Sequence, residues 1–115
     1  MPKEQSVYLE DMLEAIGRIE KYVKGLSYEK FKDNNLVSDA VLRNLEIVGE
    51  AAKNISEELK DRYDDVEWKK IVGLRDILIH AYSGVDLEII WDVIKNKLPG
   101  LKDSIVRIVK EENKR

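Results

Sequence analysis

Residues 34–60, NNLVSDAVLRNLEIVGEAAKNISEELK, carry the most regular pattern of the chain and decide the fold that we predict for it. Apolar side chains recur there at steps of three or four residues: Val37, Val41, Leu45, Val48, Ala52, Ile55 and Leu59. This spacing places all of them on one side of an α-helix. We therefore predict one unbroken amphipathic helix, with Asn34 or Asn35 as its N-cap.

Three small residues, Gly49, Ala51 and Ala52, lie in the middle of this predicted helix. Because they carry little or no side chain, another backbone can approach the helix closely there. That backbone would belong either to the same fold or to a second subunit. We expect a structural role for the glycine rather than a functional one.

The segments on either side of this helix are also predicted to be helical. Residues 4–24 repeat apolar side chains every three or four positions, and residues 25–35 form a connection with one short helical turn. A third helix is predicted over residues 66–82, because the spacing of Asp64 and Glu67 fits a capping box at its start.

The last part of the chain predicts two more helical segments. Ser83-Gly84 should end the third helix, and Asp86 should cap the next one, with Val85 stapled onto Ile90. Pro99-Gly100 should break or kink that helix, and a final helix should fade into a charged, frayed tail. The buried sides of these helices are predicted at Leu87, Ile90, Trp91, Ile94, Leu101, Ile105, Ile108 and Val109. The fold class that we predict is all-α, an up-and-down helical bundle of four to five helices.

The bulk composition limits the classes of protein to consider. With 115 residues, of which 43% are hydrophobic and 37% charged, the chain suits one globular domain over residues 1–115. Its formal net charge of -3 is not that of a stoichiometric nucleic-acid binder, so any such contact must be local, transient or made by an assembly. There is no cysteine, no signal-peptide pattern and no apolar run of membrane-spanning length. We expect a soluble, cytoplasmic protein without a membrane partner.

The candidate site is an Arg-x-x-x-x-His-x-Tyr array within the third predicted helix. It contains Arg75, His80 and Tyr82, with Asp76 directly after the arginine, and His80 is the only histidine in the chain. Arginine offers a fixed fork of donors for a phosphate, and histidine gives or takes a proton near neutral pH. These groups suffice for phosphodiester chemistry without a metal. One histidine and no cysteine leave only scattered carboxylates as ligands, so we predict no metal site and no cofactor.

Helical geometry divides the array into two stripes. Arg75 and Tyr82 share one stripe, whereas Asp76 and His80 share another at the i, i+4 spacing, where the carboxylate can orient the ring. Arg75 and His80 are roughly 140° apart on a regular helix. They converge on one substrate only through the reach of arginine, through unwinding near His80, or through pairing across a two-fold dimer.

Each of these residues also has an ordinary structural interpretation. A histidine near a helix C-terminus often interacts with the helix dipole or a hydrogen-bond partner. Tyr82 can be a half-buried aromatic residue. Arg75 can extend from an apolar face, or form an ion pair with an acid of a neighbouring helix.

The order of the residues resembles the HEPN-domain toxins of the HepT family. The resemblance lies in Val72-Gly-Leu-Arg-Asp-Ile-Leu-Ile-His-Ala-Tyr82, in the following Gly84-Val-Asp86, Trp91 and Leu98-Pro99, and in Ile47–Ile55 of the second helix. It covers nearly the whole chain. Two positions depart mildly: Glu67 stands where relatives often have proline, and Asp76 where many have asparagine. Both acids are tolerated in the wider HEPN pattern.

The resemblance implies a biological role as well as a fold. Such proteins are homodimers that bring two copies of the arginine and histidine into one cleft, and they are similar to metal-independent ribonucleases. They act as toxins in toxin-antitoxin systems of the HepT/MntA type. Their partner is an MntA-like nucleotidyltransferase antitoxin, which neutralises the toxin by transferring AMP to the motif tyrosine. The corresponding residue here is Tyr82.

Together these observations give a hypothesis and two alternatives. In the hypothesis, the protein is an endoribonuclease in which His80, oriented by Asp76, moves a proton of the 2′-hydroxyl or leaving oxygen while Arg75 binds the phosphate. RNA should be cut and DNA spared, because the route needs the 2′-hydroxyl. The first alternative is a non-catalytic helical module that binds a nucleotidyltransferase. The second is a structural bundle in which the array is buried and Arg75 supports folding.

Overall fold

The computed structural model describes residues 1–82 and 86–115, with the backbone alone for residues 80–82. The helices of this part are α1 (Lys3–Val23), α2 (Tyr28–Asp33), α3 (Asn35–Asn54), α4 (Glu57–Arg62), α5 (Trp68–Val72), α6 (Leu74–Tyr82), α7 (Leu87–Asp92), the π-helix η1 (Val93–Lys97) and α8 (Leu98–Asn113). No strand occurs among the residues described. The all-α prediction is confirmed, although these helices are shorter and more numerous than the four to five expected.

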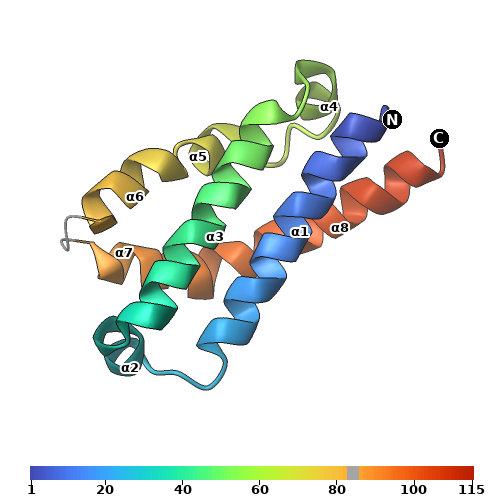
Figure 1. Cartoon of the computed structure of the whole chain (residues 1–115). Helices are drawn as coiled ribbons and strands as arrows, with labels where there is room; N and C mark the ends of the chain where they lie inside the picture. The colour runs from blue at the N-terminus through green and yellow to red at the C-terminus, as the bar shows by residue number, and fades with distance from the viewer. Residues whose placement is uncertain (83–85) are drawn as a thin grey trace.

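The centre of the bundle is formed by α1, α3 and α8. Helices α1 and α3 lie side by side and antiparallel, and α8 packs against α1 (Figure 1). On the other side of α3, the short helices α5 and α6 pack along it, and α7 contacts α6. The fully buried side chains of the three central helices are Leu9, Met12, Ala15, Ile16, Ile19, Val41, Leu45, Val48, Ala52, Ile105 and Ile108. Helix α6 is thus an outer helix held on a well-packed support.

The start of α3 agrees with the sequence prediction, but its end does not. Asn34 caps the helix, since its Oδ1 accepts a hydrogen bond from the Val37 backbone N–H at 3.1 Å. The helix ends at Asn54 and a new helix begins at Glu57, so the prediction of one unbroken helix through Leu59 is wrong. Ser56 caps the new helix by accepting from the Leu59 N–H at 3.2 Å.

A contact from the other end of the chain stabilises this break. The side chain of Gln5 in α1 accepts a hydrogen bond from the Ser56 backbone N–H at 2.7 Å and donates one to the Asn54 carbonyl at 3.4 Å. These are backbone groups that a continuous helix would have paired within itself. The interruption therefore leaves both satisfied without a further helical turn.

The predicted third helix is also interrupted. It is divided at Gly73 into α5 and α6, and Gly73 donates its N–H to the Lys69 carbonyl at 2.9 Å to close α5. The predicted capping box of Asp64 and Glu67 is wrong, because α5 begins at Trp68 with Glu67 rather than Asp64 in the N-cap position, and Glu67 makes no side-chain cap hydrogen bond. The Glu67 carboxylate lies 2.6 Å from the Lys70 ammonium.

The close backbone approach predicted at Gly49 is confirmed within the fold. A Cβ atom at this position would lie 3.4 Å from the Ile71 carbonyl oxygen and 3.8 Å from the Leu74 Cβ. The backbone of α3 thus reaches the junction between α5 and α6 because Gly49 has no side chain.

The second half of the chain follows the predicted order with different local detail. Asp86 precedes α7 but makes no side-chain cap hydrogen bond. The predicted stop at Ser83-Gly84 and the staple from Val85 lie outside the described residues. Ile90 is fully buried, as predicted. The irregularity expected near Pro99 takes the form of η1 directly before α8, and it suits proline, which lacks the N–H that a regular helix would use.

The predicted frayed tail is wrong, because Glu112 anchors the end of α8. Only 3% of this residue is exposed, and its carboxylate accepts hydrogen bonds from the Arg62 Nη1 at 2.7 Å and the Tyr63 hydroxyl at 2.6 Å. Burial alone would raise the pKa of Glu112, but the bonds from Tyr63 and Arg62 outweigh it and lower that pKa. Burial and the bond to Glu112 raise the pKa of Tyr63 to about 12.

None of the helices in the described part of the chain combines the length and the apolar character that crossing a membrane requires.

Candidate functional site

The Arg-x-x-x-x-His-x-Tyr array lies on α6, which is held to the bundle by its buried side. Leu74 and Leu78 are buried, whereas Arg75 and Asp76 in the first turn are exposed. The array is therefore presented outward at its N-terminal end. His80 and Tyr82 belong to the last turn of α6, but their side chains lie outside the described residues. The predicted contact between Asp76 and His80 and the predicted convergence of Arg75 with His80 therefore also lie outside what the structure describes.

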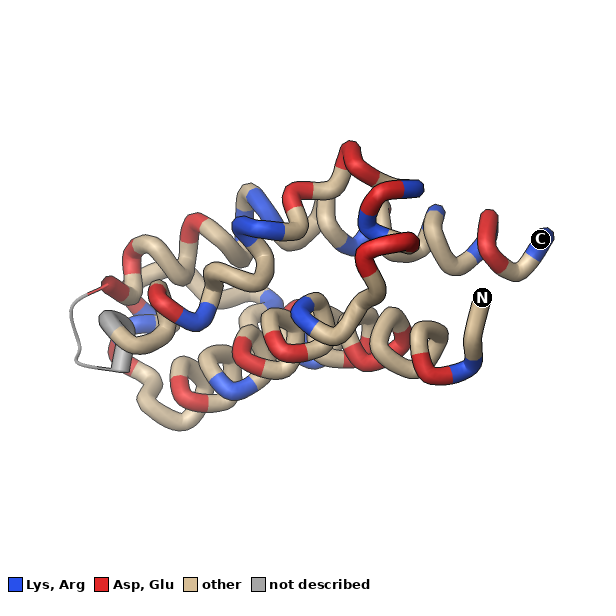
Figure 2. The backbone as a smooth tube through the Cα atoms, turned by 90° about the horizontal axis from the view of Figure 1, so that it is seen from above, with Lys and Arg blue, Asp and Glu red and all other residues tan. Residues whose placement is uncertain are grey.

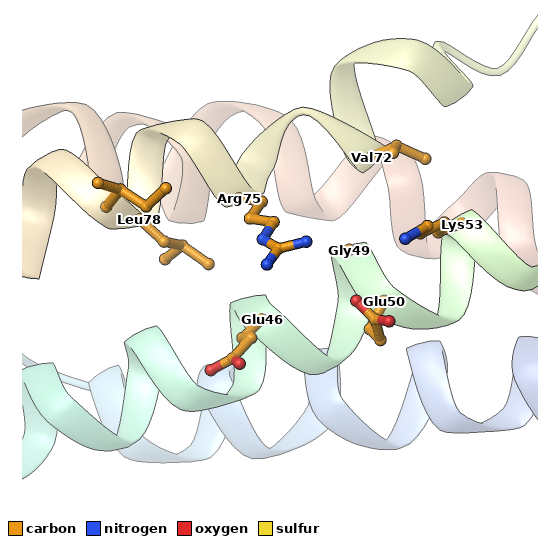
Figure 3. Close-up of a pocket in the computed structure, with 8 residues that line it drawn as sticks. Glu46, Gly49, Glu50, Lys53, Val72, Arg75 and Leu78 are labelled. Atoms are coloured by element: carbon orange, nitrogen blue, oxygen red, sulfur yellow. The ribbon is translucent and has the colours of Figure 1, made fainter.

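Arg75 lines a groove between α3 and α6 with a volume of about 480 Å³. Its guanidinium points from α6 toward α3, in the region of Gly49 (Figure 3). We call this space the Arg75 groove. Its other lining residues are Glu46, Gly49, Glu50, Lys53, Val72, Leu78 and Ile79. Asp76 does not line it. The groove thus combines an apolar wall from α5 and α6 with a charged wall from α3.

Two glycines account for the position of this groove. Gly49 lets α3 approach the α5–α6 junction, and it leaves the floor below Arg75 without a side chain. Gly73 ends α5, so that α6 restarts one residue later and Arg75 falls in its first turn. A continuous third helix, as the sequence predicted, would give Arg75 a different direction.

The charges of the groove are balanced rather than basic. Two carboxylates, Glu46 and Glu50, line it together with two cations, Lys53 and Arg75. Figure 2 shows the same mixture over the rest of the described chain, with acidic and basic residues interspersed.

The ion pairs of the described residues leave Arg75 without a carboxylate partner. Glu46 is held by Arg43 instead, whose Nη1 lies 3.6 Å from its carboxylate oxygen. Among the described residues, neither Glu46 nor Glu50 forms an ion pair with Arg75, so the interpretation of Arg75 as a partner of a neighbouring acid gains no support from them. An exposed guanidinium of this kind can bind an anion such as a phosphate.

Three residues of the groove were missed by the sequence reasoning: Glu46, Glu50 and Lys53. They repeat at i, i+4 and i+7 on the polar side of α3, which by itself is the pattern of an ordinary solvated face. Only the packing of α6 against α3 turns that face into one wall of a groove. Among the described residues, no group of three His, Cys, Asp or Glu side chains is placed to hold a metal ion.

The fold and the Arg75 groove define a small all-α, HEPN-like domain that presents an arginine on an outer helix. The family whose model is described as "Ribonuclease HepT-like" matches residues 12–108. This match extends over most of the chain, and the chain belongs to that family.

Curated relatives agree with this assignment. The chain is 38% identical to "Probable ribonuclease HepT" of Thermococcus cleftensis over 96% of this chain and 100% of that protein. It is 40% identical to a "Putative RNase" of Caldanaerobacter subterraneus subsp. tengcongensis over 91% of this chain and 94% of that protein. It is also 41% identical to a "Gamma-glutamylcyclotransferase and putative RNase" of Methanocaldococcus jannaschii, of which it spans only about half, 51%. No solved structure matches the chain significantly.

Proposed function

We propose that the protein is a metal-independent endoribonuclease that acts as a homodimer and serves as the toxin of a toxin-antitoxin pair. The observation that carries this proposal is Arg75, which is exposed, lacks an ion-pair partner among the described residues and points into a groove. Membership of the HepT-like ribonuclease family supports RNA as the substrate.

The proposed reaction is an internal transfer at phosphorus. His80 takes the proton of the RNA 2′-hydroxyl, and the 2′-oxygen attacks the adjacent phosphorus. The bond to the 5′-oxygen then breaks, and this oxygen leaves with the proton that His80 took up, which is returned directly or through water. Arg75 binds the phosphate and stabilises the charge that grows on its oxygens, while Asp76 orients the ring of His80. The products are a 2′,3′-cyclic phosphate and a 5′-hydroxyl end.

The dimer is proposed because one regular helix does not bring both groups to one phosphate. Arg75 and His80 are roughly 140° apart around such a helix. In a two-fold dimer, Arg75 of one subunit and His80 of the other can face the same cleft. Each subunit then completes the site of its partner.

The regulation that we propose acts through Tyr82. A nucleotidyltransferase antitoxin would transfer AMP to its hydroxyl, which adds a negative charge and a bulky group to the stripe that also carries Arg75. An anionic group there would repel a phosphate substrate. Mass spectrometry of the intact protein after co-expression with an MntA-like nucleotidyltransferase tests this step, with Tyr82→Phe as the variant that should lose the addition.

The test of the activity itself uses a labelled single-stranded RNA in the presence of EDTA. The wild type should cut the RNA, leave DNA of the same sequence intact and produce 2′,3′-cyclic phosphate ends. Arg75→Ala should lower the rate by roughly 100-fold or more, as loss of one transition-state donor does. His80→Ala should lower it by roughly 100- to 10,000-fold. Arg18→Ala is the matched control, because Arg18 is an exposed arginine of α1 that does not line the groove.

Two outcomes decide between this function and the alternatives. A mixture of Arg75→Ala and His80→Ala subunits should regain cleavage if the two groups act across the dimer. Cleavage at the wild-type rate by both single variants would contradict the mechanism and favour the non-catalytic module that binds a nucleotidyltransferase.

A further inference from the structure

The α3 wall of the Arg75 groove raises a question that the proposed chemistry does not answer. RNA is an anionic chain, yet this wall carries the carboxylates of Glu46 and Glu50 beside the arginine. Lys53 on the same wall balances only one of these charges, so the wall offers a second phosphate no net attraction. The part of the substrate that lies there should therefore be uncharged, and of the two uncharged parts of RNA, ribose and base, the base carries the adjacent N–H donors that a carboxylate can accept.

The size and lining of the groove suit a base. Its volume of about 480 Å³ lies within the range of roughly 300–1,000 Å³ found for small-molecule sites. The opposite wall includes Ile79, a large apolar side chain that is 60% exposed on an outer helix. This exposed apolar side chain can pack against the flat face of a base.

The two carboxylates are not equivalent. Glu46 is in contact with Arg43, which lies one turn before it on α3. Glu50 lies next to Gly49 at the groove floor, and it forms no ion pair with any of the residues described. Figure 3 shows the side chain of Glu50 on α3 beside Gly49. Glu50 is thus the carboxylate that offers two acceptors to a ligand.

We propose that the Arg75 groove is a base subsite that binds an unpaired guanine of the RNA substrate, with the Glu50 carboxylate accepting hydrogen bonds from its N1–H and N2–H groups. This inference rests on the proposed function, since it takes RNA as the ligand. Guanine is the standard base with two adjacent donors on its Watson–Crick edge. Adenine and cytosine present one donor next to an acceptor, and uracil presents one donor between two acceptors. A carboxylate, which only accepts, matches guanine best.

The experiment measures binding without cleavage. Fluorescently labelled 2′-O-methyl oligouridines carry one central guanine, inosine or adenine, and their affinities are compared by fluorescence anisotropy. The wild type should bind the guanine oligonucleotide roughly 5- to 150-fold more tightly than the adenine one, the range expected for a bidentate contact to a base. Inosine, which lacks the N2 amino group, should fall between them.

Two variants identify the carboxylate. Glu50→Ala should bind the guanine and adenine oligonucleotides equally, because both acceptors are gone. Asp39→Ala is the matched control, because Asp39 is an exposed acid of α3 that does not line the groove, and this variant should keep the guanine preference. Each variant removes one negative charge from an exposed residue of α3, so any general gain in RNA affinity is the same for both.

Any one of three results would overturn the proposed subsite. The wild type could bind the guanine and adenine oligonucleotides equally, it could bind no oligonucleotide at all, or the guanine preference could survive Glu50→Ala. The wild-type comparison of guanine, inosine and adenine decides the matter even if a variant fails to fold. Cleavage of the matching RNA oligonucleotides separates the two proposals. Cleavage without a guanine preference refutes the subsite alone, whereas a guanine preference in binding without cleavage refutes the ribonuclease alone.

Discussion

Replacing Glu112 by alanine should lower the free energy of unfolding by about 3 kcal/mol. The side chain of Glu112 is fully buried between α4 and α8, where Arg62 and Tyr63 both donate to it. Without the carboxylate, the Tyr63 hydroxyl loses its acceptor in a buried position, which costs about 1–3 kcal/mol. Arg62 also loses a charge-assisted hydrogen bond but keeps its ion pair with Glu58 at 3.2 Å. The loss of stability at Arg62 is therefore smaller than it would be for a fully buried cation.

Thermal unfolding followed by circular dichroism at neutral pH measures this effect. A loss of about 3 kcal/mol should lower the midpoint by about 10–15 °C for a chain of this size. Asp103→Ala is the control, because Asp103 is an exposed acid on the same helix and should change stability by at most about 0.5 kcal/mol. If Glu112→Ala melts within that margin of the wild type, the carboxylate does not anchor α8.

The same cluster predicts how stability depends on pH. The pKa of Glu112 is lowered in the folded state, so its contribution is present above the ordinary value of 4.5 and is lost as the pH falls through the folded pKa. The pKa of Tyr63 is raised from 10.0 to about 12 in the folded state. Its contribution to stability is therefore fully present below pH 10.0 and is lost as the pH rises through the folded pKa of about 12. The measured free energy of unfolding should therefore fall both as the pH drops below 4.5 and as it rises above 10.0. The acid loss should be smaller in Glu112→Ala.

Three further predictions test the packing and the exposure of the site. Gly25→Ala should destabilise the protein by about 1 kcal/mol, since Gly25 has a φ of 77°. Gly17→Ala should instead stabilise α1 by up to about 1 kcal/mol, because nothing lies within 4 Å of the added Cβ. The free energies of unfolding from chemical denaturation should show these opposite changes. Phe31→Ala should cost about 3–5 kcal/mol in urea unfolding because the ring is fully buried, and Leu36→Ala, at a position 82% exposed, should cost less than about 0.5 kcal/mol. Arg75→Ala should leave the melting temperature nearly unchanged, because the side chain is exposed; a large drop would instead support the structural-bundle alternative.

Local sequence patterns were sufficient for much of the fold. The three-to-four repeat predicted the all-α class and the start of α3, and of the two caps predicted, Asn34 or Asn35, the structure has Asn34. The run of small residues predicted a close backbone approach, which occurs at Gly49. These features depend on side chains a few positions apart, so the sequence contains all the information that fixes them.

Two predictions failed where a distant residue completes a backbone or side-chain hydrogen bond. Gln5 bonds Ser56 and favours the end of α3, and Arg62 and Tyr63 hold Glu112 and order the tail. Apolar periodicity reports which side of a helix is buried. It does not report which polar group from elsewhere in the chain will meet that helix.

The candidate site divides in the same way. The sequence by itself supplied the residue types of the array, because a lone histidine and a nearby arginine can be read from one segment. That Arg75 faces Glu50 across a groove was decided only by the tertiary structure, since the two residues lie on separate helices. The breaks at Gly73 and after Asn54, together with the missing side chain of Gly49, set how α6 lies on α3. Contacts between helices, which no local pattern encodes, therefore determine what the arginine can reach.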